Sequence, residues 1–264
     1  MFRWMLTVAC AFVVACGLPS DAAPSKAVPE KSNQSSKNQP PPSAAAVKSL
    51  RSIVMNQTHY FLGQVVVSVC KSAIRIESVG TYKFILIAKA PDWKVFVYRN
   101  DDKTFHESSL KEFSESGLMS QYLIGMQAPA ISGREITLSK SVGDLQIKAR
   151  RNNYALCEYI PLSNEIAPEC RTILFNTYRL PNCNGLTVKY VEQYVGKDWM
   201  TGVDETGHWK TKLSTTGSEV KLVDQKIFEL PAHYKKVPSM QQVVTGNKTR
   251  DASEDGAADL LRSR

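Results

Sequence analysis

The sequence predicts an α+β fold, in which a single curved antiparallel β-sheet carries short helices on its concave face. Three observations lead to this fold class. Short apolar segments follow one another between residues 63 and 108, and polar turn residues separate them. Two of these segments have large apolar side chains on both faces, so the second face must be covered. A helix start signal follows at residues 109–113 and provides a cover.

The two strands with apolar side chains on both faces are predicted at residues 82–88 and 93–98. The first is rich in residues that fit a pleated surface, and a proline and an aspartate form a turn after it. In the second, large apolar side chains alternate between the two faces. Further strands are predicted at residues 64–69, 72–77, 103–106, 134–139, 144–148, 171–178, 186–195, 219–223 and 226–234.

The clearest helix signal is the capping-box pattern from Ser109 to Glu112. The serine oxygen accepts from the free main-chain amide three residues on, and the glutamate reaches back. Leu110 and Phe113 then lie on one side of the helix, which we expect to cover the sheet. Two further helices are predicted. Residues 45–56 have apolar side chains at helical spacing, and residues 118–126 form a short apolar segment bounded by Gly117 and Gly125.

The chain of 264 residues divides into a predicted signal peptide at 1–16, a tether at 17–45, a folded domain at 46–240 and a disordered tail at 241–264. The apolar run before residue 16 suits a secretory signal and is too short to span a bilayer. The tether is rich in Pro and Ser and poor in large apolar side chains, so it cannot offset the entropy of folding.

Small residues precede Cys16 and resemble the bacterial lipobox, so we expect its thiol to carry a lipid. The protein would then be a lipoprotein of the cell envelope, anchored in a membrane and facing the periplasm or the exterior. The alternative is cleavage after Ala23, which would give a secreted protein.

Charge and titratable residues indicate neither a nucleic-acid-binding protein nor an enzyme. The net charge of +8 is spread along the chain without a dense basic block or a nucleic-acid-binding motif. The histidines show no metal-binding spacing, so we expect no metal and no cofactor. His106 and Glu107 form a possible acid–base pair, but a histidine on an edge strand facing water is the favoured interpretation.

The cysteines after Cys16 are predicted to form two disulfides, because an exported chain with an even number of thiols favours them. The first pairing hypothesis is Cys157 with Cys170, since prolines between them indicate a loop whose ends can meet. Three connectivities are possible, and in this one Cys70 and Cys183 form the second pair. Buried free thiols are the alternative, and a metal site ranks last.

Four segments together resemble the outer-membrane lipoprotein-sorting proteins and related uncharacterised envelope lipoproteins of bacteria. These segments are Ser72–Ile76, Phe84–Ile87, Ala90–Tyr98 and Phe228–Tyr234, following a lipobox and a long tether. The resemblance covers residues 46–240 and implies a half-open barrel whose cavity holds acyl chains. An arginine that governs access in those carriers has no match at Arg75, Arg134 or Arg150.

Two functions follow as hypotheses. The first is a non-enzymatic, membrane-tethered envelope lipoprotein that binds a lipid or a lipoprotein acyl group in an apolar cavity. The alternative is a structural or interaction module with a self-filled core, which binds a protein or an anionic envelope partner. A cluster of histidine, serine and carboxylate would instead favour a hydrolase. The predicted cavity residues are Phe84, Leu86, Trp93, Val95, Val97, Leu110 and Phe113.

Overall fold

The computed structural model describes residues 48–80, 82–118, 131–181, 183–194, 196, 202–204 and 206–246. The predicted signal peptide with Cys16, the predicted tether, and most of the predicted helix at 118–126 and of the predicted tail lie outside these residues. The described residues contain no helix that is both long and apolar enough to cross a membrane.

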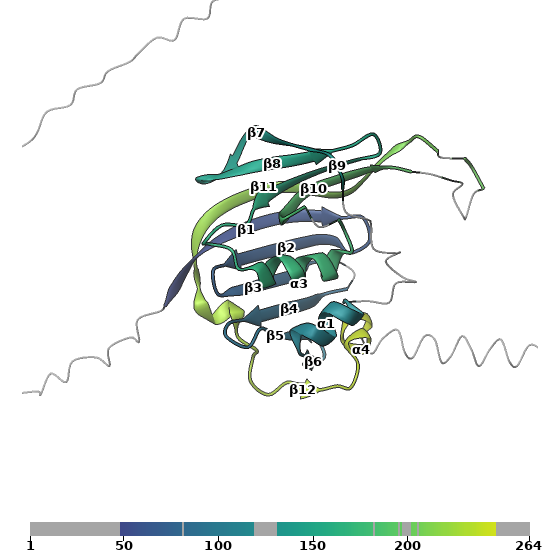
Figure 1. Cartoon of the computed structure of the whole chain (residues 1–264). Coiled ribbons are helices and arrows are strands. Elements are labelled where there is room, and N and C mark those ends of the chain that lie inside the picture. The colour runs from purple at the N-terminus through teal and green to yellow at the C-terminus, as the bar shows by residue number, and fades with distance from the viewer. Residues whose placement is uncertain are drawn as a thin grey trace, which may run out of the picture. The chain divides into compact units, whose positions relative to one another are not determined.

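The described chain forms one sheet of twelve strands that does not close into a barrel (Figure 1). The strand order is β12-β6-β5-β4-β3-β2-β1-β11-β10-β9-β8-β7. Neighbouring strands pair antiparallel, except that β12 pairs parallel with β6. The strands are β1 (Ser49–His59), β2 (Gly63–Cys70), β3 (Ala73–Ser78), β4 (Phe84–Lys89), β5 (Lys94–Arg99), β6 (Thr104–Ser108), β7 (Arg134–Val142), β8 (Leu145–Arg151), β9 (Ala155–Pro161), β10 (Gly185–Gln193), β11 (Trp209–Asp224) and β12 (Lys235–Lys236).

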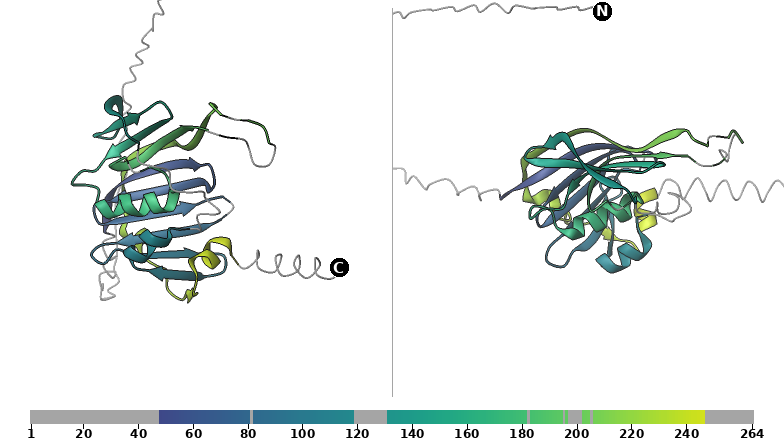
Figure 2. Two further views of the ribbon diagram at one scale, coloured as in Figure 1. Left: turned by 45° about the vertical axis from the view of Figure 1, so that its right-hand side comes forward. Right: turned by 45° about the horizontal axis from the view of Figure 1, so that its top comes forward.

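The helices α1 (Leu110–Ser116) and α3 (Pro168–Tyr178) lie across the concave face of the sheet, and α4 (Met240–Thr245) lies beside β5 and β6 (Figures 1 and 2). Apolar side chains from both helices join those of the strands in one core. The predicted fold class, a curved antiparallel sheet with short helices on its concave face, is therefore confirmed.

The capping box of α1 is confirmed in detail. Ser109 Oγ accepts from the Glu112 amide at 3.2 Å, and Glu112 Oε2 accepts from the Ser109 amide at 2.8 Å. The helix ends at Gly117, whose φ of 67° favours glycine, and a Cβ there would collide with the Arg179 guanidinium. Arg179 Nη2 donates to the Ser116 carbonyl at 2.6 Å, which ties the end of α1 to the end of α3.

The second face of β4 and β5 is covered from a different part of the chain. Ile85, Ile87 and Tyr98 are buried on this convex face and pack against Leu230 and Tyr234. These two residues belong to the segment after the 3₁₀-helix η1 (Gln225–Phe228). The expectation that both faces are covered holds, with α1 on one face and the C-terminal segment on the other.

The predicted helix at 45–56 is wrong, because β1 occupies Ser49–His59 at the centre of the sheet. Its helical spacing of apolar residues arises because β1 is buried on both faces: Ser52, Ile53, Val54 and Met55 are consecutive and all buried. A strand covered on both sides shows no alternation and is easily mistaken for a helix from periodicity alone.

The predicted strand at 171–178 is also wrong, because these residues belong to α3. Pro168 begins the helix, where its missing N–H costs nothing. The hydroxyls of Thr172 and Thr177 donate to carbonyl oxygens four residues earlier, at 3.3 and 2.8 Å, which accommodates two β-branched residues within the helix.

Other differences concern missed elements and boundaries. The predicted strand at 226–234 is instead η1 followed by irregular chain. Strand β9 was not predicted. The predicted tail begins at 241, yet residues 240–245 form α4, and Val243 and Val244 are fully buried against the sheet. The folded part therefore extends past the predicted boundary at 240.

Candidate functional site

The residues predicted to line an apolar cavity lie in the packed core of the concave face. They line none of the cavities described below. Trp93 is 9% exposed, and Leu110 is partly buried against the same core. The others have no exposed surface: Phe84, Leu86, Val95, Val97 and Phe113. In the described residues, α1 and α3 occupy the space in which a ligand cavity was expected.

A buried polar network fixes α3 to the sheet. Tyr178, at the end of α3, donates its hydroxyl proton to Gln57 Oε1 of β1 at 2.7 Å. Gln57 Nε2 in turn donates to the Thr187 carbonyl at 3.0 Å and to Thr215 Oγ1 at 3.1 Å. Burial raises the pKa of Tyr178, so its hydroxyl stays protonated and remains a donor.

His59 forms the second contact between β1 and α3. Its Nε2 lies 3.2 Å from the Tyr178 carbonyl, which can only accept, so Nε2 carries the proton. Nδ1 then accepts from the main-chain amides of Phe61 and Leu62, at 3.4 and 3.2 Å. Burial is the main cause that lowers the pKa of His59 to about 4; the hydrogen bond with the Tyr178 carbonyl opposes this shift, and the positive charge of Lys212 adds to it. The ring is therefore neutral at neutral pH.

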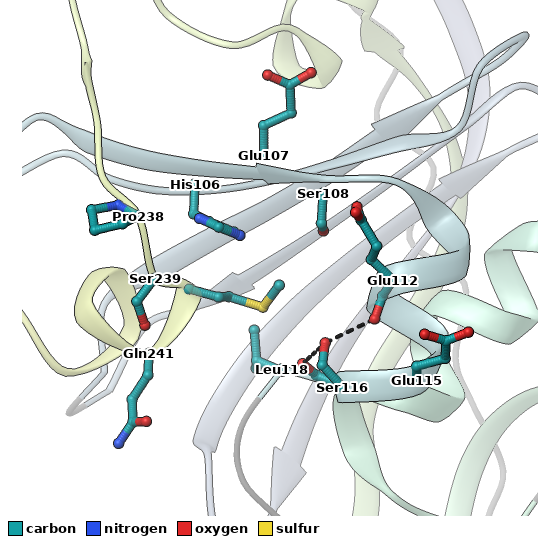
Figure 3. A pocket seen from close by; sticks show the side chains of 12 residues that line it. His106, Glu107, Ser108, Glu112, Glu115, Ser116, Leu118, Pro238, Ser239 and Gln241 are labelled. Carbon is teal, nitrogen blue, oxygen red and sulfur yellow. Dashed lines mark hydrogen bonds between the residues drawn. The ribbon is translucent and has the colours of Figure 1, made fainter.

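A cavity of about 720 Å³ opens between β6, α1 and the segment 238–241 (Figure 3). His106 and Ser108 come from β6, Glu112 and Glu115 from α1, and Met240 from α4. Because side chains alternate along a strand, the intervening Glu107 points to the other side of β6 (Figure 3). Glu107 forms ion pairs there with Lys94 and Lys236, both at 3.0 Å.

Ser108 is the unusual residue of this cavity. It is 7% exposed, and its hydroxyl has no hydrogen-bond partner among the described residues. Glu112 uses Oε2 in the capping box, and the hydrogen bonds from Ser109 hold its pKa below the ordinary value, with a smaller contribution from His106. The cavity thus combines acceptors and negative charge in a chain of net charge +8.

His106, Ser108 and Glu112 share this cavity but do not form a catalytic triad. His106 Nδ1 lies 3.0 Å from the Val237 carbonyl and so donates to a main-chain oxygen, not to a carboxylate. The Ser108 hydroxyl has no described base to activate it. A serine nucleophile of this kind needs both contacts, and neither is present among the described residues.

Two smaller cavities lie where the ends of β1 and β2 meet the loop between β9 and α3. They measure about 340 and 490 Å³ and share Lys71 and Asn164. The exposed Lys71 and Arg51 supply cations, although Arg51 already pairs with Asp144 and Glu165. The apolar lining residues are Ile53, Val69, Val220, Leu162, Ile166, Ala167 and Pro168.

The four described cysteines are buried free thiols, which corrects the predicted disulfides. The thiol of Cys157 contacts that of Cys183 through a hydrogen bond, whereas Cys170 donates to the carbonyl oxygens of Cys70 and Ala73, at 3.8 and 3.7 Å. Cys157 therefore neighbours Cys183 and not the predicted Cys170. The hydrogen bond from Cys157 lowers the pKa of Cys183, and the positive charge of Arg150 contributes to this shift.

Fold and site together define a β-sheet protein with a filled concave face and a polar, acidic cavity at one edge. No protein-family model matches the chain, and no curated protein matches it. Among solved structures, the chain is similar to an uncharacterized conserved protein from Thermus thermophilus. The identity is 9%, the match covers 70% of this chain and 89% of that chain, and the TM-score is 0.34.

Proposed function

We propose that this protein is a non-enzymatic interaction module of the cell envelope, whose own helices fill the concave face of its sheet. The observation that carries the proposal is the burial of the predicted cavity residues against α1 and α3. A protein that carries acyl chains on this face would need an unfilled apolar cavity there. The contacts from Arg179 to Ser116 and from Tyr178 to Gln57 favour helices that stay in place.

The absence of an assembled triad among the described residues of the cavity beside β6 supports a binding function over a hydrolytic one. The signal sequence and the lipobox resemblance at Cys16 support the envelope location. Growing cells with an alkyne fatty acid tests the anchor: we expect label on the wild-type chain and none on Cys16→Ala. Label retained on the variant would remove the lipid anchor from the proposal.

A second candidate function rests on the two cavities around Lys71. Their apolar walls and flanking cations suit an amphiphile with an anionic head, such as a fatty acid. This site differs from the predicted one, because it lies at the ends of β1 and β2 and not under α1. Acyl binding at this site is therefore compatible with a filled core.

Native mass spectrometry and titration with a fluorescent fatty acid distinguish the two candidates. The interaction module predicts a ligand-free chain and no saturable uptake. Uptake that Lys71→Glu abolishes would establish the second candidate, with Lys89→Glu as the control, because Lys89 is a lysine at the end of β4 that lines neither cavity. Uptake that Lys71→Glu leaves intact but that displaces α3 would overturn the proposed filled core.

A further inference from the structure

The cavity between β6, α1 and the segment 238–241 contains a buried hydroxyl that lacks a described partner. Ser108 is 7% exposed, and its Oγ is inaccessible to bulk solvent at the base of the cavity. Buried hydroxyls in folded proteins nearly always have a partner, and a hydroxyl left without one destabilises the folded state. Figure 3 shows Ser108 and His106 on the same side of β6 as the α1 carboxylates.

The cavity has hydroxyl and amide groups that can donate or accept, from Ser116, Ser239 and Gln241, and further groups that only accept. His106 donates from Nδ1 to the Val237 carbonyl, so a neutral ring leaves its Nε2 lone pair as an acceptor. Glu112 commits Oε2 to the capping box, which leaves its Oε1 as a further acceptor. Glu115, three residues further along α1, adds a second exposed carboxylate to the wall. A ligand that brings donors and positive charge matches the acceptors and the two carboxylates.

We propose that this cavity binds the cationic side chain of a lysine or arginine, presented by a basic segment of a partner protein. An ammonium group has three donors and no acceptor, and a guanidinium has five donors and no acceptor, so either matches the acceptors here. Pro238 and Met240 supply apolar surface for the methylene groups of such a side chain. This inference rests on the proposed interaction module and specifies the chemistry of its partner.

The test is a titration of the full chain with a blocked glycine pentapeptide that carries one central lysine, followed by NMR. The same peptide with norleucine removes the charge and keeps the methylenes. We expect the lysine peptide to bind about tenfold more tightly than the norleucine peptide, a difference that shrinks at high salt. Equal affinity for the two peptides would overturn the proposal.

Variants locate the binding. Glu112→Gln retains the capping box, because glutamine serves at that position, and Glu115→Gln has no capping role. We expect each single variant to lower the affinity for the lysine peptide several-fold, and the double variant to bind the lysine and norleucine peptides equally. Glu219→Gln on β11, which five strands separate from β6 in the sheet, is the matched control and should bind as wild type. Unchanged affinity in the double variant would contradict the site.

Ser108→Ala separates the hydroxyl from the charges. The variant should have a higher melting temperature than the wild type in the absence of peptide, because it removes a buried polar group without a described partner. It should also bind the lysine peptide with lower affinity. Wild-type affinity in this variant would overturn the role of Ser108 and with it the proposal. n-Butylammonium tests the source of the cation: binding as tight as that of the peptide would replace the protein partner with a small amine.

This titration and the fatty-acid titration can fail independently. Fatty-acid uptake that displaces α3 would refute the filled core and leave the cationic site standing, whereas loss of the lysine preference would refute only this site.

Discussion

The buried histidine that holds α3 to the sheet should make the fold sensitive to mild acid. His59 is 1% exposed, and its pKa is about 4 in the folded protein, against an ordinary value of 6.5. To bind a second proton, Nδ1 would have to give up the amides of Phe61 and Leu62. Lowering the pH from 7 to 4 should therefore destabilise the folded protein through His59.

Counting bound protons gives the direction in which the unfolding free energy changes with pH. Between pH 6.5 and 4 the unfolded chain binds a proton at this position and the folded chain does not, so stability falls as the pH falls. The contribution of His59 is fully present above pH 6.5 and fully lost below pH 4. The difference of about 2.5 pH units between the two pKa values corresponds to about 3 kcal/mol of unfolding free energy.

Urea unfolding at a series of pH values measures this loss, and His59→Gln is the comparison. The wild-type chain should lose about 3 kcal/mol more than the variant between pH 7 and pH 4. NMR of histidine-labelled protein gives a direct check, because the His59 ring should stay neutral down to about pH 5. Titration of His59 near its ordinary pKa, or equal acid sensitivity of the two chains, would refute the tautomer and burial described above.

Three further predictions concern the core and the thiols. Tyr178→Phe leaves Gln57 Oε1 without its 2.7 Å donor and should lower the unfolding free energy by about 1–3 kcal/mol; an unchanged value would mean that the network does not hold α3. Phe113→Ala should cost about 3–5 kcal/mol, because this side chain has no exposed surface, and a loss below about 1 kcal/mol would indicate a loose cover. When the unfolded chain is refolded with oxidised glutathione, peptide mapping should find Cys157 joined to Cys183. That disulfide should raise the unfolding free energy by about 3 kcal/mol. A Cys157–Cys170 peptide would contradict the observed thiol neighbours.

Short sequence patterns correctly predicted the helices and strands that depend mainly on contacts between residues close in sequence. The capping box at Ser109 and Glu112 is complete within four residues, and its helix forms as expected. The apolar faces of β4 and β5 likewise indicate burial on both sides. The sequence could not indicate that Leu230 and Tyr234, far along the chain, cover the convex face.

The errors arose where tertiary burial overrode local preference. In β1, burial on both faces produced apolar spacing that resembles a helix, and pairing with β2 and β11 decided the outcome. In α3, the sequence pattern predicted a strand, but the helix packs over the concave face and buries Ile173 and Leu174 there. Ser108 and Glu112 are neighbours in sequence, so their proximity was predictable. That Met240 lines the same cavity was not predictable from the sequence.

Native-state hydrogen exchange of α3 tests most directly whether the concave face stays filled. If α3 is a permanent part of the core, its amides should exchange only through global unfolding, with the same free energy as the central strands β1 and β2. Amides of α3 that exchange at a much lower free energy, while β1 and β2 stay protected, would show a helix that opens from the sheet and would contradict the filled core.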